Sequence, residues 1–227
     1  MLLIFYNPKI TDNITDSMQM IHKSKGFEDD LIIETLDLSK HDINSVAQLI
    51  SLSDENINPL LFGKDPEKTI KKLIELGNNY FSPPYTQCAV YKGQIVGIIV
   101  GFRVNEKTKL DQRSGLSFVK AMGLLSFIGK IPFIIKLDKV VSGDMDPDGY
   151  YIHQLSVDPV FQNRGFGSTI INTKAHEHKK LYLHVNYENE RAVSFYKKVG
   201  FRERSRGSTS YKGKCICECL MVKNIVL

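Results

Sequence analysis

The stretch YIHQLSVDPVFQNRGFGS, residues 151–168, is the most informative part of this 227-residue chain. Its first half reads as a strand, and Asp158-Pro159 reads as a turn. A short loop containing Gly165 and Gly167 then leads into a helix. This layout aims free backbone N–H groups and the positive end of a helix dipole at one spot, an arrangement that binds phosphate. A Cβ at either glycine would keep phosphate oxygens away from the backbone.

A Gly-x-Gly pair alone is weak evidence for any particular site. It is not a Walker loop, because no Gly-Lys-Ser/Thr follows, and it lacks the third glycine of a Rossmann fingerprint. The surrounding residues add more. Gln162 precedes Gly165 by three positions, the sequence LSVDP fills residues 155–159, and NERAVSFYKKVGF fills residues 189–201.

Together these stretches resemble the two hallmark motifs of the GCN5-related N-acetyltransferase (GNAT) superfamily. The first motif is Q/R-x-x-G-x-G/A, and the second is N-x-x-A-x-x-F/L-Y-x-x-x-G-F. They occur here in the family's order and at about its spacing. The resemblance is strong over residues 150–201 and looser over the rest of residues 31–222.

The fold that this resemblance implies is α/β, with a mixed and mostly antiparallel central sheet flanked by helices. The sheet would be splayed where the cofactor enters. We expect residues 31–227 to form the GNAT domain, residues 1–30 to be an N-terminal elaboration, and a helical insertion to fill about 103–149, between strands three and four.

Hydrophobic alternation and helix-capping signals place the elements along the chain. They predict strands at 31–36, 87–91, 94–102, 151–157 and 181–185, helices at 42–51, 66–76, from about 165 and at 190–199, and a strand pair within 201–222. The insertion is apolar around 116–130, but Lys120, Lys130 and Pro132 interrupt it. A bilayer span needs about 20 apolar residues, so we expect a helix or helix pair that walls the fold, with a membrane-surface helix as the alternative.

The resemblance implies acetyl-CoA as the acyl donor and assigns residues to it. The pantetheine arm would lie along the backbone at Leu155, Ser156 and Val157, beside Asn189, with the sulfur near Tyr196. The diphosphate would be wrapped by Gln162, Asn163, Arg164, Gly165, Phe166, Gly167 and Ser168.

Two residues are candidates for proton transfer. Tyr196 suits the general acid, because a phenol of pKa about 10 holds its proton at neutral pH; the alternative is a tyrosine packed in the core. His153 is the candidate base, since its pKa of about 6.5 lies near neutrality. We expect it on one strand face with Tyr151, Leu155 and Val157. A structural or substrate-contacting histidine, with ordered water as the base, remains the alternative.

Composition limits the partners. A net charge of +5 with Lys and Arg spread along the chain argues against nucleic-acid binding. The cysteines are Cys88, Cys215, Cys217 and Cys219. The last three alternate along one strand at no usual zinc spacing, so we expect buried thiols and no metal site. The N-terminus lacks a signal-peptide pattern, which predicts a cytoplasmic protein without stable membrane insertion.

The expected reaction is direct transfer of an acetyl group from acetyl-CoA to a primary amine of a small-molecule acceptor. Two alternatives stay open: a protein or peptide N-acetyltransferase, and a non-catalytic sensor module that binds CoA. A homodimer is also left open, and the identity of the acceptor is not readable from the sequence.

Overall fold

The computed structural model describes residues 30–225, so the expectations for residues 1–29 lie outside it. The strands are β1 (Leu31–Thr35), β2 (Thr86–Tyr91), β3 (Gln94–Arg103), β4 (Tyr150–Val157), β5 (Lys180–Asn186), β6 (Arg202–Tyr211) and β7 (Lys214–Asn224). The helices are α2 (Ile43–Leu52), α3 (Ile57–Phe62), α4 (Pro66–Leu76), α5 (Lys107–Met122), α6 (Leu124–Val140), α7 (Phe166–Glu177) and α8 (Glu190–Lys198). Every element predicted within the described part is present.

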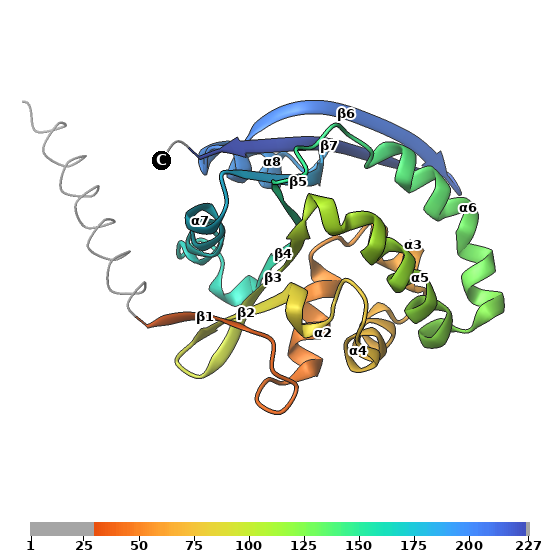
Figure 1. Cartoon of the computed structure of the whole chain (residues 1–227), viewed down its shortest axis with the longest axis horizontal. Coiled ribbons are helices and arrows are strands. Elements are labelled where there is room, and N and C mark those ends of the chain that lie inside the picture. The colour runs from red at the N-terminus through yellow and green to blue at the C-terminus, as the bar shows by residue number, and fades with distance from the viewer. Residues whose placement is uncertain (1–29, 226–227) are drawn as a thin grey trace, which may run out of the picture.

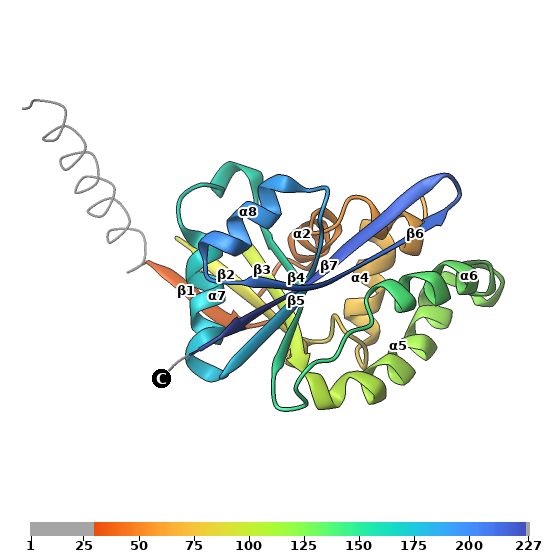
Figure 2. The same ribbon diagram turned by 90° about the horizontal axis from the view of Figure 1, so that it is seen from above.

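The strands form one sheet in the order β1-β2-β3-β4-β5-β7-β6, with helices on both faces (Figures 1 and 2). Only β4 and β5 pair in parallel; the other neighbours are antiparallel. One apolar cluster joins the sheet to α7 and α8, and another joins it to α2, α3, α4 and α5. The mixed, mostly antiparallel α/β sheet predicted from the sequence is therefore confirmed.

Capping explains where the first helices begin. The Asp42 carboxylate accepts from the backbone N–H groups of Asn44 and Ser45 at the start of α2. Asp65 caps α4 in the same way. Helix α3 was not predicted, because its first-turn amides are capped from outside by Asp54 and because Pro59 stands in its middle.

A β-bulge in β4 decides which way its side chains point. Val100 pairs with Gln154 and Gly101 with Ile152, so His153 is the extra residue. The bulge reverses the alternation: Ile152 packs in the same cluster as Leu155 and Val157, under α7 and α8. Tyr151 packs in a different cluster, and the His153 ring lies 6.2 Å from the Tyr151 ring. The prediction that His153 shares a face with Leu155 and Val157 is therefore wrong.

The sheet opens between β4 and β5. Their pairing covers three residue pairs and ends at Ile152↔Leu183. Beyond it, β5 continues to pair with β7 as far as Asn186↔Glu218, whereas the end of β4, residues 154–157, pairs with β3 alone. The predicted splay is present, and it leaves backbone groups of β4 without a strand partner.

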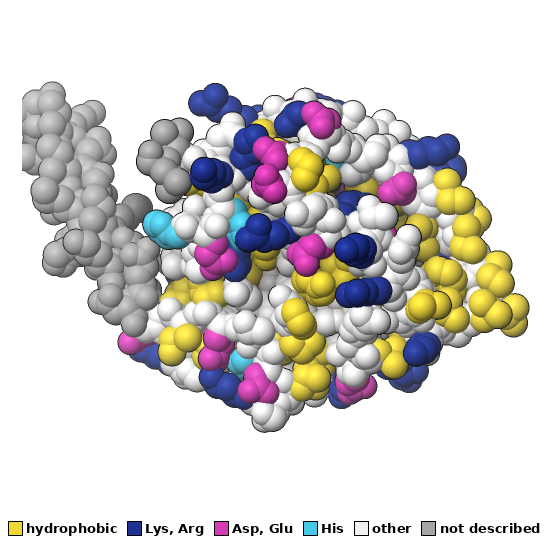
Figure 3. Space-filling model, viewed as in Figure 1, with side chains coloured by type: hydrophobic (Ala, Val, Ile, Leu, Met, Phe, Trp, Pro, Cys, Tyr) yellow, Lys and Arg dark blue, Asp and Glu magenta, His cyan; other side chains and the backbone are white. Residues whose placement is uncertain are grey.

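The insertion between β3 and β4 consists of α5 and α6, which confirms the predicted helical insertion. Helix α6 packs beside β6, where the rings of Phe133 and Tyr211 lie 5.2 Å apart. Its outer side is apolar, with Leu125 86% exposed, and Figure 3 shows such side chains gathered over the α5–α6 end of the molecule. Within residues 30–225, no helix combines the length and the hydropathy that a membrane span requires.

The cysteines depart in part from expectation. Cys88 and Cys219 are buried thiols, but Cys215 and Cys217 form a disulfide, with their Cα atoms 5.8 Å apart. The expectation of thiols at these two positions is therefore wrong. The reason is local: residues two apart on a strand project to the same side, which brings both sulfurs together on β7.

Candidate active site

A cavity of about 1470 Å³ passes through the splay of the sheet. Its wall includes the facing edges of β4 and β5, together with residues from the helices on both faces of the sheet. Pockets for one small ligand usually measure roughly 300–1,000 Å³, so this cavity has room for two reactants. It contains a cradle at the start of α7 and a chamber on the opposite face.

The cradle is the N-terminus of α7. Gly165 precedes the helix at φ +90°, and its position as N-cap provides no side-chain hydrogen bond to the first turn. The helices α2, α4 and α8 differ, because Asp42, Asp65 and Asn189 cap them. First-turn amides lack an intrahelical acceptor and carry the positive end of the dipole. The uncapped end of α7 is therefore suited to an anion.

The structure explains the need for glycine at the two motif positions in different ways. A Cβ on Gly165 would meet no atom within 4 Å, but the left-handed φ favours glycine. A Cβ on Gly167 would lie 3.1 Å from the ring of Phe195, so this glycine lets α7 approach α8. The structure thus gives a packing reason for Gly167, and the expectation that it also leaves room for phosphate oxygens stays a prediction.

The loop before α7 is fastened to its surroundings. Gln162 donates from Nε2 to the Val157 carbonyl at 2.9 Å and accepts from Arg191 at 2.8 Å. Arg164 lies over the ring of Phe161, 5.2 Å from its centre. Gln162 thus holds the loop in place through hydrogen bonds at both its amide nitrogen and its amide oxygen.

Tyr196 projects from α8 into the cavity wall. Its ring packs against Phe195 and Phe201, with ring centres 5.2 and 5.7 Å away. Burial raises the pKa of its hydroxyl to about 12. Within the described chain this hydroxyl makes no hydrogen bond, so it is a protonated donor available to a ligand.

His153 lines the chamber on the other face of the sheet. Its ring stacks on Tyr80, with ring centres 4.6 Å apart. Burial, followed by the charge of Lys107 and then by His184, lowers the pKa of His153 to about 4. The side chain is neutral at physiological pH and a much weaker base than its ordinary pKa suggested.

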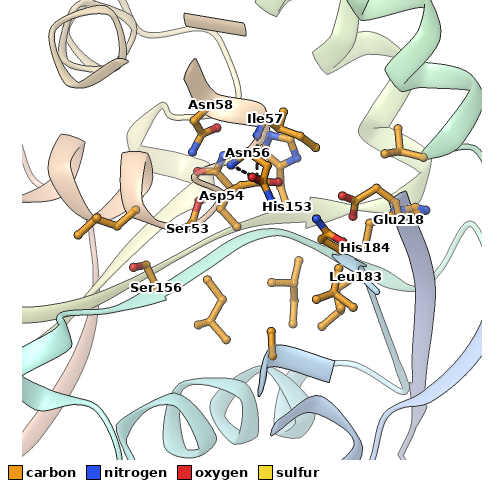
Figure 4. Close-up of a pocket in the computed structure, with 18 of the residues that line it drawn as sticks. Ser53, Asp54, Asn56, Ile57, Asn58, His153, Ser156, Leu183, His184 and Glu218 are labelled. Carbon is orange, nitrogen blue, oxygen red and sulfur yellow. Dashed lines mark hydrogen bonds between the residues drawn. The ribbon is translucent and has the colours of Figure 1, made fainter. Parts of the chain in front are cut away.

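Three further polar side chains of the chamber, His184, Glu218 and Asp54, were not predicted (Figure 4). The Tyr151 hydroxyl lies 2.9 Å from Nδ1 of His184, and Nε2 of His184 is buried without a partner among the described residues. Glu218 on β7 is 4% exposed; burial, and then Asp54, raise its pKa to about 8. Burial also raises the pKa of Asp54.

The two ends of the cavity differ in charge. The chamber wall contains more acids than bases: Asp54, Glu55, Asp111, Asp138 and Glu218 against Lys107 and Lys139. The wall contributed by the loop before α7, by α7 and by α8 contains Arg191 and Lys198 and no acid. Such a gradient favours an anionic ligand at the α7 end and a cationic one in the chamber.

Comparison with known proteins agrees with this geometry. The family model described as "Acetyltransferase (GNAT) family" matches residues 54–201. The chain belongs to the GNAT family. An uncharacterized N-acetyltransferase of Methanocaldococcus jannaschii is 44% identical over 59 residues, covering 23% of this chain and 26% of that protein. The peptidyl-lysine N-acetyltransferase YjaB of Escherichia coli is 35% identical over 72 residues, covering 32% of this chain and 49% of YjaB.

This GNAT chain therefore spans no more than about half the length of these two curated relatives. An N-acetyltransferase structure from Staphylococcus aureus Mu50 superposes with a TM-score of 0.62 at 16% identity, covering 84% of this chain and 99% of that one. At that identity the likeness concerns the fold.

The motif residues of the GNAT resemblance gather on one wall. The cavity is lined by Leu155, Ser156, Val157, Gln162, Asn163, Gly165, Phe166, Gly167, Ser168, Asn189 and Tyr196. Arg164 is not among the lining residues, and Phe166 packs in the core with 2% of the whole residue exposed. Asn189 accepts from the Ala192 amide at 3.0 Å, which uses one amide oxygen as a helix cap.

One group outside this wall has the composition of a metal site. The Glu188 carboxylate and the sulfurs of Cys215 and Cys217 lie within 4.8 Å of one another. Because the two sulfurs are bonded to each other, neither is a thiolate that could bind a metal in this structure.

The polar residues that the sequence analysis missed lie in the chamber. Glu218 was treated only as part of a terminal strand, although a Glu among the otherwise apolar residues 216–222 was a signal for it.

Proposed function

We propose that this protein is an acetyl-CoA-dependent N-acetyltransferase that acetylates a primary amine of a small molecule. The observation that carries this proposal is a single cavity that joins the uncapped start of α7 to an acidic chamber through the splay. The donor and the acceptor can thus approach the same point from opposite faces of the sheet.

The cofactor would lie on the α7 side. Its diphosphate would accept hydrogen bonds from the amides of Gly167 and Ser168, and each charge-assisted bond contributes about 1.5–3 kcal/mol. The pantetheine amides would replace the missing strand partner along Leu155 and Val157. The thioester would then lie at the splay, near the Tyr196 hydroxyl.

The reaction itself is a direct transfer. The neutral amine nitrogen forms a bond to the thioester carbonyl carbon, the carbon–sulfur bond breaks, one proton leaves nitrogen and one reaches sulfur. We assign the donation toward sulfur to Tyr196, whose raised pKa keeps its proton in place. The proton from nitrogen would leave through water along the polar wall of Tyr151 and His184.

His153 takes a lesser part in this scheme. An alkylammonium has a pKa of about 10.4, so transfer of its proton to a group of pKa about 4 is strongly uphill. We therefore propose that His153 contacts the acceptor, which is one of the alternatives to a base named in the sequence analysis. Its neutral ring, stacked on Tyr80, forms part of the chamber wall.

A peptide lysine is the second candidate acceptor. One relative is named a peptidyl-lysine N-acetyltransferase, and a lysine side chain also presents a primary amine on an aliphatic chain. We favour the small molecule, because residues of α3, α5 and α6 line the chamber and form a wall of helices around it.

The test is acetylation by the purified protein, measured as CoA release and by mass spectrometry of the acceptor. Small amines and lysine peptides are compared as acceptors. We expect turnover with small amines, and Tyr196→Phe should lower it by about 10²–10⁴-fold with acetyl-CoA affinity nearly unchanged. Tyr211→Phe, outside the cavity wall, is the matched control.

The outcomes separate the candidates. Acetylation confined to peptides would favour the second candidate. Binding of acetyl-CoA without transfer to any amine would favour the non-catalytic sensor, and full activity of Tyr196→Phe would remove that residue from the reaction.

A further inference from the structure

Glu218 is an unusual side chain, because it is an acid that is 4% exposed and has no partner among the described residues. It is 4% exposed on β7, it lines the chamber, and it forms no hydrogen bond or ion pair with the residues that the structure describes. Figure 4 shows it in the chamber beside His184. A buried carboxyl group without a partner is costly, which points to a ligand that supplies one.

The groups around Glu218 do not supply a cation. Its electrostatic neighbours are Asp54, from the loop between α2 and α3, and Tyr151 of β4. The other titratable residues that line the chamber include His153, His184, Lys107, Asp111 and Lys139. Both histidines have pKa values lowered to about 4. Lys107 is paired with Asp111 at 3.0 Å. Among the described residues, Glu218 therefore has no counterion.

Asp54 provides a second carboxyl group in the same chamber. Its Oδ1 accepts from the amides of Asn56 and Ile57 at 3.0 and 2.9 Å. No described residue hydrogen-bonds its Oδ2. Asp54 is close enough to Glu218 for its charge to add to the effect of burial and raise the pKa of Glu218.

A monoamine acceptor cannot supply a positive charge to both carboxyl groups during the reaction. The reacting nitrogen must lose its charge before it attacks, and it ends as an uncharged amide. It cannot neutralise Glu218 and Asp54 during the transfer. A second, non-reacting ammonium on the same acceptor would keep its charge throughout and pair with both.

The walls between these polar groups are apolar. Leu61, Phe62, Phe81, Phe118 and Phe127 line the chamber. Such surfaces suit a chain of methylene groups rather than a sugar or a peptide backbone. The occupant would thus be aliphatic along its length and cationic at its ends.

We propose that the acceptor is an aliphatic diamine or polyamine, whose non-reacting ammonium binds between Glu218 and Asp54. This inference rests on the proposed acetyltransferase function and names the substrate class of the same site. The reacting amine of the molecule then lies toward the splay.

The test compares α,ω-diamines of three to six carbons with n-alkylamines of equal length, as initial rates of CoA release. For the wild-type protein, kcat/KM should be at least about tenfold higher for the diamines than for the monoamines, and in Glu218→Gln this ratio should fall to about one. Asp54→Asn should act in the same direction, because its side-chain oxygen can still cap α3. Glu75→Gln, exposed on α4, is the matched control and should leave the preference intact.

A binding readout accompanies the rates. Because the pKa of Glu218 is about 8 in the empty chamber, a bound ammonium should displace its proton. Calorimetry of diamine binding to the CoA-saturated protein, in buffers of different ionisation enthalpy at pH 7, should show proton release in the wild type and none in Glu218→Gln.

Each result has a consequence. Equal rates with monoamines and diamines, or a preference that survives Glu218→Gln in a folded variant, would overturn the diamine proposal and leave the acetyltransferase standing. If acetyl-CoA binds but no amine is acetylated, both proposals fall.

Discussion

Burial keeps three cavity side chains uncharged at neutral pH. It raises the pKa of Tyr196 to about 12 and that of Glu218 to about 8, and it lowers the pKa of His153 to about 4. In each case desolvation penalises the charged form. A cationic ligand can change this state, because a positive charge close to Glu218 favours loss of its proton and formation of the carboxylate.

The raised pKa of Glu218 makes a prediction about stability. The native state binds more protons than the unfolded state between the unfolded pKa of 4.5 and the folded pKa of about 8. The free energy of unfolding should fall as pH rises through this window and change no further above it. Glu218→Gln removes the effect, so at pH 9 the empty variant should be more stable than the wild type by on the order of 5 kcal/mol.

Urea unfolding at pH 4.5 and pH 9 measures this difference. The two proteins should have nearly equal stability at pH 4.5, and Glu75→Gln should follow the wild type at both values. If the difference in free energy of unfolding between the wild type and Glu218→Gln were the same at pH 9 as at pH 4.5, Glu218 would ionise normally.

Which residues the sequence could predict depends on how local their signals are. Gln162, Gly165 and Tyr196 lie in contiguous motifs, so their places on one wall could be anticipated. The face of His153 could not, because the bulge beside it depends on pairing with β3. Glu218 and Asp54 are 164 positions apart in the sequence, and only the folded sheet brings them to one chamber.

Among the elements, the start of α7 differs from the other helix starts. Asp42, Asp65 and Asn189 cap α2, α4 and α8, and these caps were readable as sequence signals in the first two cases. Gly165 offers no side chain and instead turns the backbone into the helix at φ +90°. The starts of α2 and α4 were predictable because the capping residue stands directly before the helix in the sequence. The start of α3 was not, because its first amides are capped by Asp54 from the preceding loop.

A pair of glycine substitutions tests the turn before α7. Gly165→Ala meets no atom within 4 Å, but a left-handed φ costs a residue with a Cβ about 1–2 kcal/mol. Gly129→Ala also meets no atom, on an exposed turn of α6, and should stabilise by about 0.5–1 kcal/mol. Urea unfolding should thus give opposite signs; equal shifts would mean that Gly165 does not need this conformation.

At the scale of the whole molecule, the splay determines how the two faces of the sheet cooperate. The cradle at α7 belongs to one face, and the acidic chamber under α3, α5 and α6 belongs to the other. Because β4 and β5 separate after Ile152↔Leu183, a thioester bound on one face can meet an amine bound on the other. The family pattern predicted this opening, but the charge and shape of the chamber depend on the insertion and the α2–α3 loop, which carry no motif.

The most direct test of this account is calorimetric titration of acetyl-CoA into the wild type and into Ser168→Asp. An aspartate in the first turn of α7 favours the helix, but its charge opposes a diphosphate in the cradle. We predict one acetyl-CoA per wild-type chain, affinity at least about tenfold weaker in Ser168→Asp, and affinity within about threefold of wild type in the uncharged Ser168→Asn. Absence of binding to the folded wild type, or equal affinity in all three proteins, would contradict the cradle.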